Sequence, residues 1–209
     1  SISELLRHVL GLPSNISSGA APFKPDDIDS RLYTYRPCAF RILLFFLAYQ
    51  IKNLYDTIVW ADGPEFIFHH ILASATAVAA MHSSVGHYYC IFFMGISETS
   101  TGILCLLANF DEHHGVIGLE QDFPLTRLVV AAFFVVSFIA IRVIVWPIYA
   151  RWFWMDVSKA VKRNSETDTP LKKKLLRCTS MTCAGLSALQ VLWLGEIFRL
   201  GYAELQKSI

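Results

Sequence analysis

Charged residues are scarce in this chain. Asp, Glu, Lys and Arg make up only 17% of its 209 residues, whereas soluble globular domains average about 25%. The 18 basic and 17 acidic side chains nearly cancel, so the basic stripe of a nucleic-acid-binding surface is missing and we expect no nucleic-acid partner. Hydrophobic residues reach 54%, which indicates a membrane protein.

Metal-binding spacings are also missing. The five cysteines lie in or beside apolar segments, and Cys178 and Cys183 have four residues between them, so we expect buried thiols and no metal site. A di-iron hydroxylase needs about eight clustered ligands, but the chain has seven histidines and no His-x-x-His-His motif. An isolated metal site at the loop histidines is the one alternative left.

The most prominent feature of the sequence is its long apolar segments. Five of them approach the roughly 20 residues that a helix needs to cross a bilayer: Ala39 to Trp60, Phe66 to Met81, Tyr88 to Phe110, Leu125 to Trp146 and Met181 to Tyr202. Lipid offers no partner to a free backbone N–H or C=O, and the segments lack the alternation of barrel strands, so we expect helices. The predicted fold class is an all-α membrane protein with a bundle of five or six transmembrane helices, the fourth kinked or ended by Pro147.

The ends of these segments differ in composition. The first 37 residues contain four prolines and three aspartates, which predicts a Pro-rich surface arm over 1–37 and a transmembrane domain over 38–209. The connector from Arg151 to Arg177 has eight basic and three acidic residues, whereas the loop from Asp111 to Pro124 has four acidic residues and no basic one. The positive-inside rule favours a cytoplasmic connector, although the orientation stays open.

Some charged side chains fall inside the apolar segments, where each costs a few kcal/mol on insertion scales. We expect such groups to face the bundle interior and to have partners. Asp56 lies four residues after Lys52 on one helix and can pair with it. Glu98 lies in the middle of the third segment, and its most economical counter-ion is Arg142, halfway along the fourth.

Other polar residues accompany these charges. Ser97 and Ser100 flank Glu98, and their hydroxyls can bond back to helix carbonyls. Gln190, Trp193 and Glu196 follow one another at a spacing of three, so they share one face of the last helix. We expect that face to be interior.

Two adjacent histidines, His69 and His70, open the second apolar segment. Successive helical positions diverge by about 100°, so one imidazole can face the interior while the other lines an adjacent wall. A neutral imidazole accepts a proton near pH 7 and can act as a general base in attack on an acyl group. The alternative for each is a hydrogen-bonded structural histidine. Their position after a buried Asp56 favours a site.

The order of these elements resembles the TLC-domain family, which includes ceramide synthases and translocating-chain-associating proteins. The matching residues are Tyr55-Asp56, His69-His70, Glu98-Thr-Ser100, Arg142 with Pro147, and Leu189-Gln190-Val-Leu-Trp193. The resemblance implies a ring of helices around a lipid-accessible cavity, in the endoplasmic reticulum membrane or in another organelle membrane such as the mitochondrial inner membrane. Ceramide synthases carry two aspartates three apart where this chain has Ser97, Glu98 and Ser100, which indicates a non-synthase branch.

Three functions stay open. The first is the binding or handling of a lipid acyl chain in an intramembrane cavity, with membrane lipids as partners and catalysis uncertain. The second is a non-catalytic accessory subunit that packs against other membrane protein subunits. The third is an N-acyltransferase of the ceramide synthase type, which alone would need acyl-CoA. Candidate catalytic residues are His69, His70, Asp56 and Glu98, and candidate lipid-binding residues are Ser97, Ser100, Arg142, Gln190 and Trp193.

Overall fold

The computed structural model describes residues 27–111, 115–163 and 169–207. All regular secondary structure within these ranges is helical, and five helical segments are long and apolar enough to cross a membrane: Ile28–Trp60, Pro64–Ser83, His87–Ala108, Pro124–Lys162 and Pro170–Ala203. The predicted all-α membrane fold with five spanning segments is confirmed. The loop histidines His113 and His114 and most of the predicted arm lie outside the described residues.

The first two spans are regular helices that begin at prolines. The short α2 (Ile28–Leu32) precedes α3 (Pro37–Trp60), which is followed by α4 (Pro64–Ser83). Pro37 and Pro64 occupy the first turns of α3 and α4, where the missing N–H needs no partner. Between α3 and α4 the chain turns through Ala61 and Gly63, both with positive φ.

The third and fourth spans each contain a π-helical segment. The third consists of α5 (His87–Ile91), the π-helix η1 (Phe92–Ile96) and α6 (Glu98–Ala108). After the short α7 (Leu119–Asp122), the fourth span consists of α8 (Pro124–Phe138), the π-helix η2 (Ile139–Val145) and α9 (Trp146–Lys162). Pro147 does not end this span, because it lies in the first turn of α9 just after the wide π turns.

The last span, α10 (Pro170–Lys207), begins well before the expected start at Met181. Because α9 and α10 both extend further than the apolar pattern predicts, most of the predicted connector from Arg151 to Arg177 is helical. Only residues 163–169 join the two helices. Seven of the eight basic residues of this region therefore lie on α9 or α10 rather than on a long loop, and Arg163 directly follows α9.

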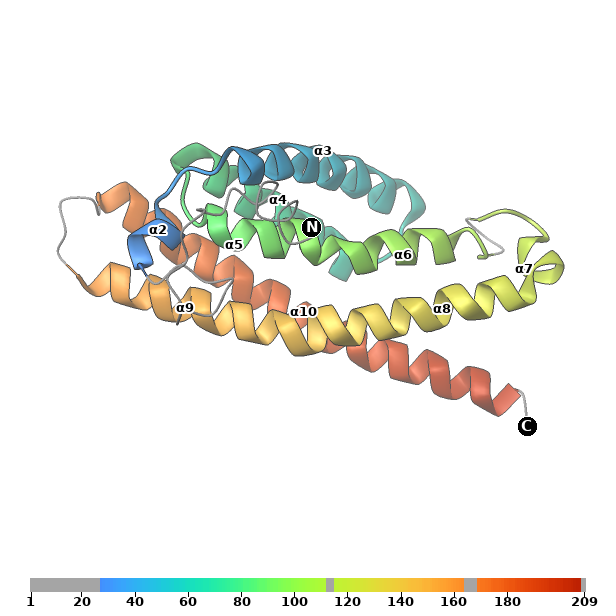
Figure 1. Ribbon diagram of the computed structural model, residues 1–209. Coiled ribbons are helices and arrows are strands. Elements are labelled where there is room, and N and C mark those ends of the chain that lie inside the picture. Colours follow the sequence, from blue (N-terminus) through green and yellow to red (C-terminus); the bar gives the residue numbers. More distant parts are fainter. Residues whose placement is uncertain (1–26, 112–114, 164–168, 208–209) are drawn as a thin grey trace, which may run out of the picture.

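The spans form one bundle in which α3 packs on α4, α4 on α10, α10 on α9, and α6 on α8 (Figure 1). One apolar core joins α2, α5 and η1 to α9 and α10 through residues such as Tyr89, Phe153 and Leu186. A second core joins α3 and α4 to α5 and η1 around Phe46, Ala77 and Met94. The large apolar side chains left exposed, such as Phe45 and Val136, suit contact with lipid.

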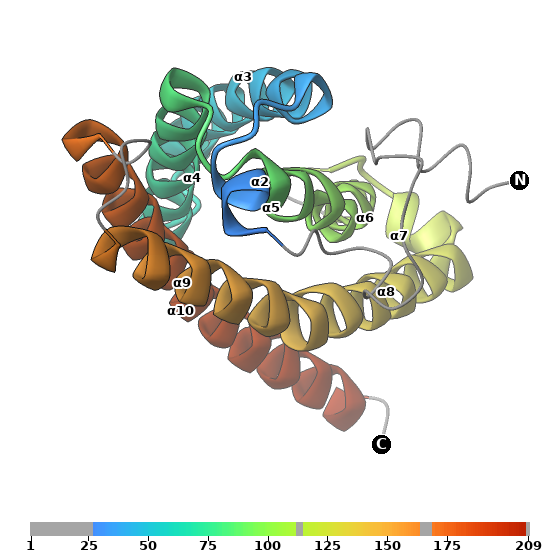
Figure 2. The same cartoon turned by 60° about the vertical axis from the view of Figure 1, so that its left-hand side comes forward.

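The last residues of the predicted arm are packed against the bundle. Figure 2 shows α2 at one end of the bundle, beside α5 and α9. Arg31 in α2 donates to both carboxylate oxygens of Asp156 in α9, at 2.5 and 2.8 Å, and the hydroxyl of Tyr89 donates to the same carboxylate. All three side chains are buried. The domain boundary near residue 37 stays a prediction.

The cysteine prediction is wrong for two of the five residues. Cys90 and Cys183 are buried as expected, whereas Cys105 and Cys178 are exposed on the outer surface of the bundle. A thiol is stabilised by contact with lipid as much as by burial in protein, so the sequence does not distinguish a cysteine that faces lipid from a buried one. Among the described residues, no group of three or more His, Cys, Asp or Glu side chains could hold a metal ion.

Candidate functional site

Both π-helical segments lie next to polar side chains in the middle of the bundle. In η1 the backbone N–H of Ser97 bonds to the carbonyl of Phe92 at 2.9 Å, five residues earlier, and α6 then begins at Glu98. In η2 the widened turn contains Arg142. Single π turns change the direction in which the following side chains point, and they concentrate at functional sites. Here they orient Glu98 and Arg142 toward each other.

Arg142 is the centre of a polar cluster that joins three helical segments. Its side chain is 5% exposed and makes five hydrogen-bond contacts with α6, with Ser97 just before α6 and with α10, three of them sharing the two hydrogens of Nη2. The partners are the Ser100 hydroxyl at 2.9 Å, the Gln190 amide oxygen at 3.3 Å, the Ser97 carbonyl at 3.1 Å, the Glu98 carboxylate at 3.1 Å and the Thr101 hydroxyl at 2.8 Å.

The ion pair between Glu98 and Arg142 that the sequence suggests is present. The Glu98 side chain is 20% exposed, so both charges are largely removed from solvent and each needs the other. With the hydroxyl and amide partners, each of the three guanidinium nitrogens has at least one acceptor. The cluster therefore carries no excess charge, and it fixes α10 against the third and fourth spans.

The two histidines diverge as their adjacent positions require. His70 is buried, and its Nδ1 lies 2.5 Å from the amide oxygen of Gln50 in α3. His69 stacks edge-on against Trp193 of α10, with ring centroids 5.0 Å apart. No described residue provides a hydrogen-bond partner for Nδ1 of His69, Nε1 of Trp193 or the amide nitrogens of Gln50 and Gln190, although all four atoms are buried.

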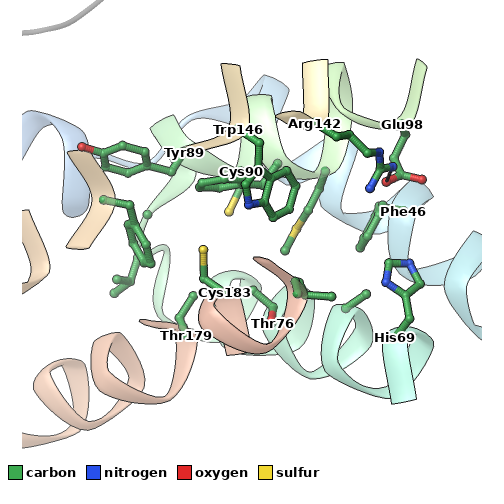
Figure 3. Close-up of a pocket in the computed structure, with 17 residues that line it drawn as sticks. Phe46, His69, Thr76, Tyr89, Cys90, Glu98, Arg142, Trp146, Thr179 and Cys183 are labelled. Carbon is green, nitrogen blue, oxygen red and sulfur yellow. Dashed lines mark hydrogen bonds and ion pairs between the residues drawn. The ribbon is translucent and has the colours of Figure 1, made fainter. Parts of the chain in front are cut away.

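A narrow internal cavity begins at this polar end. Its volume is about 30 Å³, and it runs between residues of all five spans. Figure 3 shows His69, Glu98 and Arg142 together at one end, while Cys90 and Cys183 approach each other further along. Apart from these groups the lining is mainly apolar: Phe46, Ala73, Val85, Phe93, Met94, Trp146, Phe153 and Leu186. The arrangement offers a polar end and an apolar wall.

Two of the residues singled out in the sequence lie elsewhere. Asp56 forms an ion pair with Lys52 on the same helix, as their spacing allows, and it does not line the cavity. Glu196 was expected on an interior face, but its side chain is 55% exposed and pairs with Arg199. Gln190 and Trp193 do face inward, so the interior face of α10 ends before Glu196.

Several residues that bond to the histidines or to Arg142, or that line the cavity, were not among the candidates from the sequence. Gln50 is a neutral polar residue within an otherwise apolar helix, and that contrast could have identified it as the partner of His70. Thr101 could have been found from its spacing of three after Glu98. Phe46, Met94 and Leu186 carry no such signal, because an apolar residue that lines a cavity looks like one that faces lipid.

Comparison with protein families gives a match to the TLC domain over residues 13–199, which is most of the chain. This chain belongs to the TLC-domain family. The family is a membrane family related to lipids, and the five apolar spans make this member a multi-pass membrane protein. Comparisons with curated proteins and with solved structures found no match.

Proposed function

We propose that this TLC-domain protein binds one lipid acyl chain inside the bundle, with the polar part of the acyl group near His69 and the hydrocarbon along the apolar wall. The observation that carries the proposal is the convergence of all five spans on one apolar cavity whose polar end includes an unpaired imidazole nitrogen. Buried polar atoms are nearly always satisfied, so unpaired ones at a cavity end favour a ligand that completes them.

The chemistry of the polar end favours a neutral group on the lipid. Glu98 already balances the charge of Arg142, and each guanidinium nitrogen has a partner within the protein. The unpaired polar atom on the cavity wall is Nδ1 of His69, and further unpaired N–H groups belong to Trp193, which packs on His69, and to Gln190, which accepts from Arg142. An ester or amide carbonyl fits such donors, whereas a phosphate would need an uncompensated positive charge.

The cavity has to widen before it holds a chain. One water molecule needs at least about 10–15 Å³, so a volume of about 30 Å³ accommodates two waters and not an acyl chain. Phe46 and Met94 line the cavity, and rotation of such side chains would enlarge it. We expect the lipid to enter by displacing apolar side chains, since His69 already lies on the cavity wall.

Binding without catalysis is the better interpretation of the histidines. A general base is normally oriented by a third group that bonds its other nitrogen. His70 is bonded to a neutral glutamine amide, and among the described residues no carboxylate bonds to the imidazole of His69. Asp56, the acid expected to support the pair, is bonded to Lys52 instead.

Native mass spectrometry of the protein in mild detergent tests this proposal. We expect a fraction of the purified protein to retain one lipid with an ester or amide bond. Replacing Met94 with Trp fills the cavity from η1 and should lower the retained fraction at least about tenfold, which corresponds to about 1.4 kcal/mol. The matched control is Met181→Trp, because Met181 is 75% exposed on α10 and lies outside the cavity.

A second pair of variants separates lipid loss from misfolding. His69→Ala removes the polar contact and leaves more space, whereas His82→Ala changes an exposed histidine on the same helix. Circular dichroism and gel filtration establish that each variant is folded. Equal lipid retention by Met94→Trp, His69→Ala and their controls would contradict the proposal.

A further inference from the structure

The outward face of α9 carries a surface depression that is separate from the internal cavity. Arg151, Trp154, Met155, Ser158 and Lys159 line a shallow, open depression of about 350 Å³, and these five residues are called the α9 basic surface. Trp154 and Met155 give it an apolar part, Arg151 and Lys159 give it two cations, and Ser158 adds a hydroxyl. The indole N–H of Trp154 donates to the carbonyl of Ser180 in α10 at 3.3 Å, which fixes the ring.

The two cations of this surface are uncompensated. Arg151 and Lys159 are exposed, and no described carboxylate pairs with either side chain. The one acidic residue of α9, Asp156, is turned inward to Arg31. Arg163, just after the end of the same helix, already pairs with Asp29. The α9 basic surface is thus a place where positive charge is left free.

Its position matches the boundary between hydrocarbon and headgroups. The surface lies near the end of the most apolar of the five spans, and Trp152 and Trp154 lie in the same turns, as is typical of residues at the headgroup level. Figure 1 shows α9 ending at the opposite end of the bundle from α7, whose acidic residues are Glu120 and Asp122. Arg151 and Lys159 therefore lie toward the membrane face opposite to Glu120 and Asp122.

We propose that the α9 basic surface docks the phosphate headgroup of an anionic phospholipid from the surrounding bilayer. Arg151 and Lys159 would contact the phosphate and the hydroxyl or anionic group of the headgroup alcohol. The acyl chains would cover Trp154 and Met155. The proposal commits to a bilayer lipid because the depression joins an apolar part to cations, and a soluble phosphate would gain nothing from that apolar part. It is independent of the lipid proposed for the internal cavity.

The test measures how much phosphatidylglycerol the protein retains after its release from nanodiscs. The nanodiscs consist of phosphatidylcholine with about 10–20% phosphatidylglycerol, so that the anionic lipid is in the minority. A basic residue near an anionic surface contributes about fivefold in affinity, so Arg151→Gln/Lys159→Gln should retain about twentyfold less. The control Lys52→Gln/Arg127→Gln removes the same charge from residues that pair with Asp56 and Glu120.

The outcomes separate the proposal from its rivals. Selective loss of phosphatidylglycerol from the α9 variant, with the control unchanged, supports it. Equal loss from both variants would show a response to net charge alone and would overturn it. Displacement of the lipid by inorganic phosphate at millimolar concentration would also overturn it, because the site would then recognise a free anion. The Met94→Trp variant should leave this binding unchanged.

Discussion

Replacing Arg142 with Met should destabilise the bundle by about 3 kcal/mol, because it removes the centre of the polar cluster while nearly keeping the side-chain volume. The five hydrogen bonds of Arg142 provide one route to this magnitude. Interhelical hydrogen bonds in membranes average about 0.6 kcal/mol each, which gives about 3 kcal/mol for five. The second route is the cost of leaving a buried charge without its partner, which is about 3–5 kcal/mol.

The second route predicts a partial rescue. In Arg142→Met the Glu98 carboxylate stays largely buried without a cation, so changing Glu98 to Gln in the same chain should recover at least about 1 kcal/mol. A double-mutant cycle of Arg142→Met and Glu98→Gln would then show a coupling of about 1–3 kcal/mol. The matched control is Arg199→Met with Glu196→Gln, an exposed pair that should contribute less than about 1 kcal/mol.

Equilibrium unfolding in mixed micelles of a mild detergent and dodecyl sulfate, followed by far-UV circular dichroism, measures these differences. The reasoning is refuted if Arg142→Met costs less than about 1 kcal/mol, or if the cycle is additive, since the cluster would then not join the helices. A cost equal to that of the exposed control pair would lead to the same conclusion.

Two further predictions concern helix packing. Asp156→Asn should cost about 3–5 kcal/mol in the same unfolding assay, because the charge of Arg31 is then buried without a carboxylate; a cost below about 1 kcal/mol would mean that α2 is not held by this pair. Gly185→Val should cost about 1–3 kcal/mol, because a Cβ at Gly185 would meet the Leu72 methyl at 2.8 Å. Gly195→Val is the control, since a Cβ there meets nothing within 4 Å; equal costs would contradict close packing of α4 on α10.

The features that could be predicted from the sequence are those with a strong local cause. Apolar segments that are long enough to cross the bilayer as helices indicate spanning helices, whichever segments they pack against. Glu98 and Arg142 could be paired because each charge at membrane depth needs a partner and few candidates exist. The divergence of His69 and His70 follows from helix geometry alone.

The features that could not be predicted depend on tertiary contacts. The extension of α9 and α10 beyond the apolar pattern depends on packing between their polar ends. The docking of α2 depends on Arg31 reaching Asp156, which is 125 residues away in the sequence. The π turns of η1 and η2 have no compositional signal. Asp56 was expected at the site because its side chain was assumed to be buried. Its ion pair with Lys52, one helical turn earlier, instead stabilises the carboxylate outside the cavity.

The most direct test of the proposed internal lipid site is photo-crosslinking in nanodiscs with a glycerolipid whose acyl chain carries a diazirine, followed by peptide mass spectrometry. The structure predicts adducts on inward residues of several spans, namely Phe46, Ala73, Met94 and Leu186, and their loss in Met94→Trp. Adducts confined to outward residues such as Phe45, Leu128 and Val136, unchanged by that variant, would contradict an acyl chain inside the bundle.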